Sequence, residues 1–197
     1  RNPHVPTVHM NHRRLSRGAS GWFGGGSDLT PYYLVEEDCR HFHATLRDVC
    51  ARHPGVADHA RFKRDCDNYF FNHHRGEARG IGGTFFDHMH ESPEATLTFM
   101  ADSCAAFLDA YLPIVLAHID TPWTDEERLW QRLRRGRYVE FNLLHDRGTL
   151  FGLKTGGRVE SILMSMPPDV AWQYDHEPAA GTRERALLDV LRSPRDW

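Results

Sequence analysis

The sequence predicts an α+β fold: a large, mainly antiparallel β-sheet flanked by α-helices on both faces. Segments with strand-like alternation and segments with helical periodicity come in blocks along the chain, and this arrangement favours an antiparallel sheet over a strict βαβ order. The chain has 197 residues, of which 40% are hydrophobic and 26% are charged, an ordinary balance for a globular protein. We therefore expect one domain spanning residues 1–197.

The first predicted strand covers residues 7–13, where apolar and polar side chains alternate. Pro3 and Pro6 stand just before it and confine the start of the segment to an extended or edge conformation. Residues 14–21 are expected to form a polar connection. They lead to three consecutive glycines at 24–26, which allow positive φ or a close approach of the backbone to a ligand.

Several segments carry the 3.6-residue periodicity of helices. The first opens at Thr30 and Pro31, with the threonine as a cap and the proline in the first turn. The predicted helical regions cover residues 30–50, 57–71, 93–118, 125–135 and 183–191. Between the second and third of them, a glycine-rich turn at residues 80–83 feeds a strand that ends near Asp87.

Three short stretches near the C-terminus alternate apolar and polar residues. They cover residues 138–144, 150–154 and 158–165, and turn-forming residues separate them at 146–148 and 155–157. This spacing predicts a β-meander. Residues 172–174 are expected to add a short strand.

Composition limits the classes of function. The net charge is −3, whereas a nucleic-acid-binding domain needs a strongly basic face. No run of 18 apolar residues or signal peptide is visible, so we expect no membrane span. The four cysteines, Cys39, Cys50, Cys66 and Cys104, have no CxxC spacing, and this is typical of reduced thiols in a cytosolic protein. The chain opens on Arg1 inside a proline-rich stretch, from which we expect a truncated N-terminus.

Histidines from separate predicted elements form the first candidate site. His9 lies in the first strand, His43 on the apolar face of the first helix, and either His73 or His74 at the end of the second. Three histidines that converge in this way can bind a metal ion. The alternative is that each is an ordinary hydrogen-bonded histidine.

Two further candidates involve charge. Asp28 follows the glycine run, where a carboxylate can accept protons or bind N–H groups; the alternative is a turn or helix-capping aspartate. The chain has 22 arginines but only two lysines, and arginines suit the recognition of carboxylates. Five are singled out, against the alternative of solvent-exposed ion pairs: Arg13, Arg75, Arg79, Arg137 and Arg158.

The stretch from Lys63 to Asp87 resembles the signature of the aerobic, oxygen-dependent coproporphyrinogen oxidases. That signature has the form K-x-W-C-x-x-Y-F, then H-R-x-E-x-R-G-I-G-G-x-F-F-D, and the chain departs from it at Asp65, which stands where the family has tryptophan. The resemblance continues over nearly the whole chain, including residues 135–142, 146–149, 160–165 and 194–197.

The resemblance implies oxidation of coproporphyrinogen III to protoporphyrinogen IX in haem biosynthesis. Two propionate side chains become vinyl groups by oxidative decarboxylation, with O2 as co-substrate and CO2 and hydrogen peroxide as products. The family needs no organic cofactor. It also implies a homodimer formed through residues 138–174, and a cytoplasmic location, or a mitochondrial one in a eukaryote.

Site residues follow from the resemblance position by position. Asp28 matches the aspartate that binds or deprotonates the pyrrole nitrogens, and His9 the proton donor. Two triplets match substrate contacts: Asn11, His12 and Arg13, then Gly156, Gly157 and Arg158. His9, His43 and His74 match positions that bind a divalent metal in bacterial members.

Physical chemistry supports the assignment of Asp28, since a carboxylate desolvated in an aromatic pocket is expected to gain basicity. Two other functions remain open at this point. One is an oxygenase in which the three histidines hold a metal ion that activates O2. The other is a non-catalytic protein that binds a tetrapyrrole.

Overall fold

The structure is a computed structural model that describes residues 2–18 and 20–197. It combines helices with antiparallel strands, which confirms the α+β class, although the sheet is smaller than expected. In chain order the elements are β1 Thr7–Arg17, β2 Ser20–Thr30, α1 Glu36–Ala51, α2 His59–Tyr69, β3 Phe71–Asn72, β4 Glu77–Ala78, β5 Gly82–Met89, α3 Pro93–Ala105, α4 Phe107–His118, α5 Asp125–Leu144, α6 Arg147–Lys154, α7 Val159–Ile162 and α8 Arg183–Arg192.

The main sheet has its strands in the antiparallel order β1-β2-β5, with β2 in the centre. β1 and β2 pair over their full length, from Thr7 opposite Thr30 to Arg17 opposite Ser20. The predicted polar connection at residues 14–21 is therefore wrong over most of its length, because the two strands continue almost to their tip. β3 and β4 form a separate short ribbon.

The three consecutive glycines lie inside the central strand β2, where outer-strand side chains close over them. A Cβ added at Gly24 would come 2.7 Å from Oδ1 of Asp87 on β5 and 3.0 Å from Nη2 of Arg13 on β1. A Cβ at Gly25 would come 2.5 Å from the ring of His12. Glycine leaves the room for these side chains to meet across β2.

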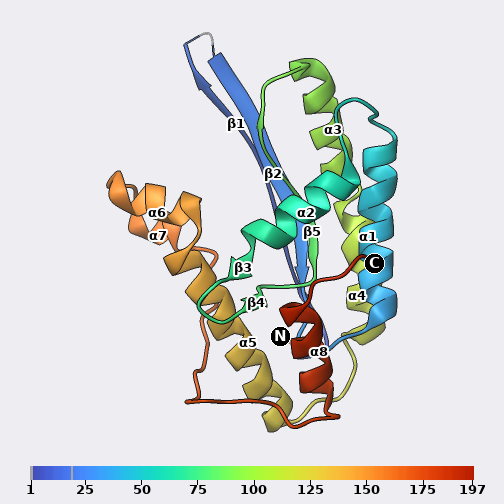
Figure 1. Ribbon diagram of the computed structural model, residues 1–197, viewed down its shortest axis with the longest axis vertical. Helices are drawn as coiled ribbons and strands as arrows, with labels where there is room; N and C mark the ends of the chain where they lie inside the picture. The colour runs from blue at the N-terminus through green and yellow to red at the C-terminus, as the bar shows by residue number, and fades with distance from the viewer. Residues whose placement is uncertain (1, 19) are drawn as a thin grey trace.

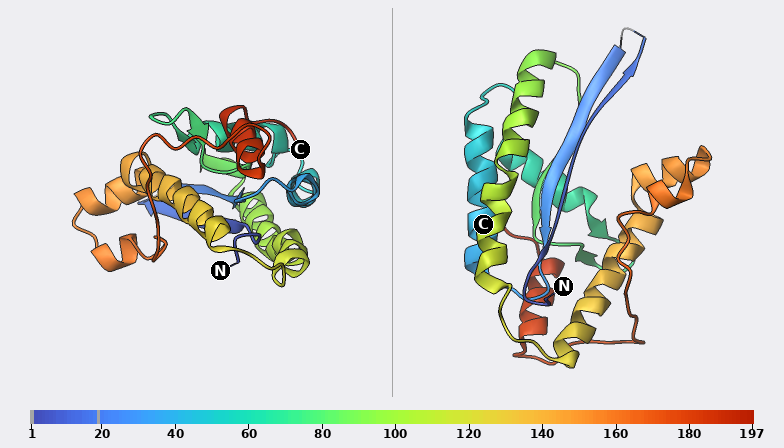
Figure 2. Two further views of the ribbon diagram at one scale, coloured as in Figure 1. Left: turned by 90° about the horizontal axis from the view of Figure 1, so that it is seen from below. Right: turned by 180° about the vertical axis from the view of Figure 1, so that it is seen from behind.

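Helices cover both faces of the sheet (Figures 1 and 2). On one face, α1 and α3 close an apolar core that contains Phe23, Val49, Cys50, Phe62, Phe86, Phe99 and Met100. α2 runs along the edge strand β5 and reaches both faces: Phe62 packs on Phe86 at 5.2 Å between ring centroids, and Phe70 on Phe85 at 5.6 Å. α5 lies on the other face, across from α1, α3 and α4 (Figure 2).

The predicted helix at residues 93–118 is a pair of helices, α3 and α4, that meet at Ala106. By length and composition alone this apolar stretch could cross a membrane. Ala110 and Ile114 are nevertheless buried in the core next to α1, while Leu108, Leu112 and Leu116 are exposed. The expectation of no membrane span stays a prediction.

The predicted β-meander is wrong. α5 begins with a capping box formed by Thr124 and Glu127 and continues to Leu144, well past the predicted end at residue 135. Its buried residues Tyr138, Phe141 and Asn142 follow the i, i+3, i+4 spacing of a helix face, which a short stretch of alternation can imitate. The following segments are the helices α6 and α7, and residues 172–174 contain no strand.

α6 and α7 form an arm, residues 147–162, that projects away from the rest of the molecule (Figures 1 and 2). Thr149 is the buried residue of α6, and none of the four residues of α7 is buried. This α6–α7 arm therefore does not belong to the core.

Candidate active site

A cavity of about 780 Å³ lies between the sheet, α2, α5 and the α6–α7 arm. Side chains two apart on a strand share a face, and β1 accordingly lines the cavity with His9, Asn11, Arg13 and Leu15. Much of the remaining wall is aromatic, and it is formed by Trp22, Tyr69, Phe70, Phe85, Tyr138 and Phe151. The cavity thus combines an apolar wall with a few polar groups, as small-molecule sites commonly do.

His12 lies on the opposite face of the sheet. Its ring packs 5.7 Å from that of Phe86, and its Nδ1 is 3.1 Å from Sγ of Cys104 on α3. Burial lowers the pKa of His12. The expected triplet of substrate contacts is therefore divided by the strand alternation: Asn11 and Arg13 line the cavity, and His12 does not.

The signature stretch supplies a large share of the cavity wall. Tyr69 and Phe70 come from the end of α2, Arg79 from the turn before β5, and Phe85 and Asp87 from β5 itself. The rings of Tyr69 and Phe85 stack at 4.4 Å between centroids. The stretch that carries the family resemblance therefore also forms part of the site.

Asp28 lies behind the cavity wall, between the buried Arg79 and His9, whose side chain is partly exposed to the cavity. Its Oδ2 accepts a hydrogen bond from Nη2 of Arg79 at 2.7 Å, and its Oδ1 is 3.2 Å from Nδ1 of His9, directly opposite on β1. The side chains of Asp28 and Arg79 are 4% and 1% exposed. The ion pair is therefore almost completely removed from water.

The pKa of Asp28 moves in the opposite direction from the expected one. Burial acts to raise it, but the charge of Arg79 and the hydrogen bond with His9 outweigh burial and lower the pKa. Asp28 is therefore an ionised partner for its neighbours and a weaker base than a desolvated aspartate without a counter-ion would be.

Arg79 is held by aromatic rings as well as by Asp28. Its guanidinium carbon lies 3.9 Å from the centroid of Phe70 and 5.0 Å from those of Tyr138 and Phe141. Cation–π contacts of this kind are strongest when desolvated. Arg79 was one of five arginines singled out in the sequence, and the signal that separates it from the others is its position directly before the glycine-rich turn.

The cavity rim carries a second charged group. Asp87 places Oδ1 3.2 Å from Nη2 of Arg13 and Oδ2 3.4 Å from Nη2 of Arg147. Arg13 also donates to Oδ1 of Asn11 at 2.8 Å. Two arginines from opposite walls therefore converge at the entrance.

Comparison with known proteins settles the family. A family model described as coproporphyrinogen III oxidase matches residues 1–197. The chain belongs to the coproporphyrinogen III oxidase family. Its relatives include the human "Oxygen-dependent coproporphyrinogen-III oxidase, mitochondrial", 52% identical over 204 residues that cover 100% of this chain and 45% of the relative.

Other members of the family are about as similar. A chloroplastic oxygen-dependent coproporphyrinogen-III oxidase of Hordeum vulgare is 47% identical and one of Drosophila melanogaster 51% identical. Each match covers 100% of this chain, and 53% and 52% of those relatives respectively. The chain spans about half the length of the curated relatives it matches.

The three histidines expected to bind a metal in this family member do not converge. Nε2 of His43 is 3.2 Å from the carbonyl oxygen of Ile81, and burial lowers the pKa of His43 to about 3. Nε2 of His74 is 2.8 Å from Oε2 of Glu140. Within residues 2–18 and 20–197, no group of three or more His, Cys, Asp or Glu side chains is arranged to hold a metal. The metal-binding role expected for His9, His43 and His74 stays a prediction.

Gly156, Gly157 and Arg158 lie on the α6–α7 arm, at the connection between its two helices. All three are exposed, and Arg158 is 3.7 Å from Glu160, itself equally exposed. None of them lines the cavity. In this chain the second expected triplet of substrate contacts is thus separated from His9, Asp28 and Arg13.

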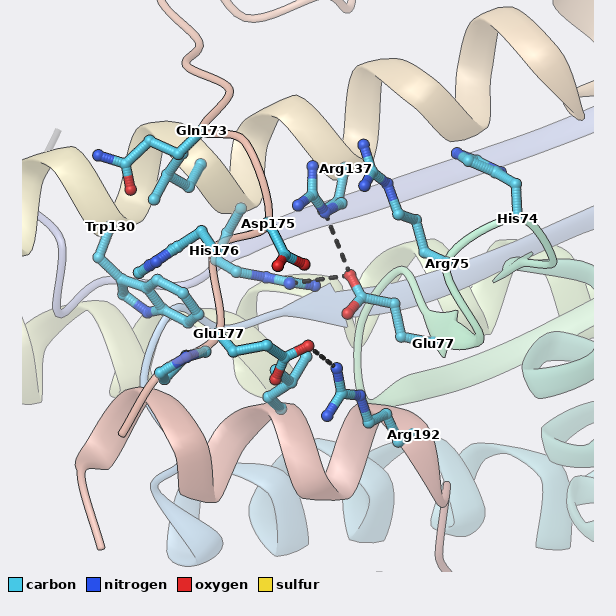
Figure 3. Close-up of a pocket in the computed structure, with 14 residues that line it drawn as sticks. His74, Arg75, Glu77, Trp130, Arg137, Gln173, Asp175, His176, Glu177 and Arg192 are labelled. Atoms are coloured by element: carbon cyan, nitrogen blue, oxygen red, sulfur yellow. Dashed lines mark hydrogen bonds and ion pairs between the residues drawn. The ribbon is translucent and has the colours of Figure 1, made fainter. Parts of the chain in front are cut away.

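A smaller cavity of about 210 Å³ lies between α5, the β4 ribbon and α8 (Figure 3). Its arginines have acidic partners: Arg134 and Arg137 flank Glu77, and Arg192 pairs with Glu177. His74 and Arg75 stand at its edge (Figure 3) and both bind Glu140. The pairs of Glu77 and Glu140 link α5 to the β3–β4 ribbon, and Nε1 of Trp172 in the C-terminal segment donates to Glu140 at 2.9 Å. We interpret this network as structural.

Proposed function

We propose that the protein catalyses the O2-dependent oxidative decarboxylation of two propionates of coproporphyrinogen III, giving protoporphyrinogen IX in haem biosynthesis. The observation that carries the proposal is the cavity in which an Asp28–Arg79–His9 cluster underlies an aromatic wall and Arg13 stands at the rim. The names of the relatives, oxygen-dependent coproporphyrinogen-III oxidases, support the choice of substrate and of O2.

The reaction balances without an organic cofactor. Each propionic acid side chain and one O2 give a vinyl group, CO2 and hydrogen peroxide; the C–C bond to the carboxyl carbon breaks, and the two electrons and two protons released reduce O2. The reduced tetrapyrrole is itself electron-rich, so O2 serves as the electron acceptor. We propose no organic cofactor, and the proposed steps use no metal ion.

The substrate offers groups that match the cavity. It carries four carboxylates, which suit Arg13, and four pyrrole N–H groups, which suit a hydrogen-bond acceptor deeper in the cavity. The volume of about 780 Å³ falls in the usual range for small-molecule sites, roughly 300–1,000 Å³. We propose Asn11 and Arg13 as substrate contacts and leave His12 out.

We propose that His9 transfers the proton and that ionised Asp28 orients it. With Nδ1 of His9 directed at Asp28, its Nε2 is the ring atom that remains for the substrate. A carboxylate partner fixes the tautomer of an imidazole and stabilises the protonated form. Arg79 in turn keeps Asp28 ionised, so the role of Asp28 is positioning and charge stabilisation rather than direct proton abstraction.

The test is aerobic incubation of the purified protein with coproporphyrinogen III, followed by chromatography of the vinyl products and measurement of peroxide. We expect His9→Gln and Asp28→Asn to lower turnover by about 100-fold or more. His12→Gln is the matched control, since it alters the same strand on the opposite face and should keep most of the activity. Tetrapyrrole binding without product would favour a non-catalytic protein, and activity lost on chelation and restored by metal would favour a metal oxygenase.

We also propose that the protein is a homodimer formed through residues 138–174. Large apolar side chains of this region are exposed in one chain, among them Phe151 at 69% and Met164 at 80%. Exposed apolar surface of this kind is typical of interfaces. In such a dimer, the second expected triplet of one chain, Gly156, Gly157 and Arg158, would approach the cavity of the other chain.

Light scattering during gel filtration tests the dimer. Phe151→Asp together with Met164→Asp should shift the mass from two chains to one, while Leu116→Asp on α4 should not. A wild-type protein that elutes as a monomer at high concentration would contradict it.

Relatives are named mitochondrial or chloroplastic; for this chain we propose the cytoplasm, or the mitochondrion if the source is a eukaryote.

A further inference from the structure

Arg147 lies on the cavity wall that faces β1, and its backbone is held in place by hydrogen bonds. It is the first residue of α6, whose N-cap Asp146 accepts a hydrogen bond from the backbone N–H of Thr149 at 2.7 Å. The hydroxyl of Tyr69 accepts from the backbone N–H of Arg147 and donates to Oδ1 of Asp146, each at 3.1 Å. The backbone of Arg147 is therefore fixed to the end of α2.

The guanidinium of Arg147 is far less constrained. It lies over the ring of Tyr69, 4.8 Å from the centroid, and the side chain is 60% exposed. Its acidic partner is Asp87, at 3.4 Å. An arginine that is anchored at its base, stacked on an aromatic ring and open at its tip is well arranged to receive a carboxylate.

Asp87 is shared between Arg147 and Arg13, and both contacts are loose. The distances of 3.4 and 3.2 Å exceed the 2.7 Å of the buried pair between Arg79 and Asp28.

Asp87 has a further partner that does not depend on the arginines. Its Oδ1 accepts from the backbone N–H of His88 at 3.0 Å. Gly24 lies directly beneath the arrangement, where a Cβ would come 2.7 Å from the same oxygen. The carboxylate can therefore remain hydrogen-bonded at the sheet when the arginines turn to another anion.

We propose that Arg147 is a second substrate-binding arginine, which with Arg13 forms a carboxylate clamp, and that Asp87 occupies the clamp until a carboxylate of the substrate replaces it. The nature of the ligand, a tetrapyrrole with carboxylate arms, rests on the proposed function, whereas the clamp itself requires no turnover. Arg147 and Arg13 approach from opposite walls, so a ligand held by both would lie across the cavity, on the face of β1 that carries His9.

The probe is coproporphyrin III, the stable oxidised form of the proposed substrate, and its tetramethyl ester is the matched probe without carboxylates. Binding is followed by porphyrin fluorescence on the purified full chain. Arg147→Gln should weaken binding of the acid about 10-fold, the equivalent of about 1.4 kcal/mol, and leave ester binding unchanged. Arg40→Gln, on the exposed surface of α1, is the control and should change neither.

Asp87→Asn separates the clamp from a structural role. If Asp87 competes with the ligand, its removal should tighten binding of the acid several-fold; if Asp87 only holds the arginines in place, its removal should weaken binding, and the proposal falls. Unchanged acid binding by Arg147→Gln, or an equal loss for acid and ester, would also overturn it. Carboxylate-dependent binding without turnover of coproporphyrinogen III would instead leave the clamp standing and contradict the proposed function.

Discussion

The buried pair of Arg79 and Asp28 gives a prediction whose size can be worked out from the structure. Arg79→Leu would leave the Asp28 carboxylate, 4% exposed, with His9 as its remaining side-chain partner. Loss of one member of a buried ion pair typically costs about 3–5 kcal/mol, because the other charge stays buried and unpaired. In a protein of this length about 1 kcal/mol corresponds to roughly 2–4 °C, so we expect the melting temperature to fall by about 6–20 °C.

The double variant tests whether the loss comes from the unpaired charge. Asp28→Asn alone leaves Arg79 buried without its counter-ion and should also be strongly destabilising. In Arg79→Leu/Asp28→Asn both charges are gone, so the loss should be at least about 2 kcal/mol smaller than the sum of the two single losses. Urea unfolding followed by circular dichroism measures all four proteins.

Wild type and Arg79→Leu should also differ in how their stability changes with pH. In the wild type the pKa of Asp28 is lowered, so the pair contributes stability above the ordinary pKa of an aspartate and loses it as pH falls through the lowered value. In Arg79→Leu burial raises the pKa of Asp28, so the variant should recover stability relative to wild type as pH falls from 7 toward 5. The reasoning would be refuted if either single variant had a free energy of unfolding within about 1 kcal/mol of wild type. It would also be refuted if the loss in the double variant equalled the sum of the two single losses.

Two further predictions follow from buried groups. Burial raises the pKa of Cys39 to about 12 and that of Cys50 to about 11, and Cys66 is also buried. A thiol reagent at pH 8 should therefore modify one cysteine, Cys104, in the folded protein and all four in urea. Rapid reaction of more than one cysteine in the folded protein would contradict this. Although burial acts to raise the pKa of Glu140, Arg75, His74 and Arg137 lower it to about 2. Its contribution to stability should therefore be lost as pH falls from about 4.5 toward 2, and acid unfolding curves of wild type and Glu140→Gln should converge there; curves that stay parallel would rule the contribution out.

Much of the helical part of the fold could be predicted from the sequence. The stripe from Cys39 to Cys50 and the last helix near Leu187 have unambiguous 3.6-residue periodicity and are helices in the structure. The segments after residue 138 could not be assigned correctly, because stretches of five to eight residues are compatible with either period. Their state is set by α5, which starts at a strong capping box and carries the helix through Tyr138 and Phe141.

The site was predictable in part. The resemblance named His9 and Asp28, and the structure places them opposite each other on paired strands. The resemblance could not show that His12 faces away from the cavity. That orientation depends on β1 extending through residue 13, with side chains that alternate strictly between the two faces of the sheet. The role of Arg79 depends on a pairing across 51 positions of sequence, which local patterns do not contain.

We propose that a tetrapyrrole binds in the cavity of about 780 Å³ with its pyrrole nitrogens at His9. A crystal structure of the protein with coproporphyrin III tests this most directly. We predict a pyrrole nitrogen within hydrogen-bond distance of Nε2 of His9, Asp28 behind that histidine, and a propionate at Arg13. A porphyrin bound elsewhere, for example at the charged cavity of Figure 3, or one in this cavity with its pyrrole nitrogens turned away from His9, would contradict the account.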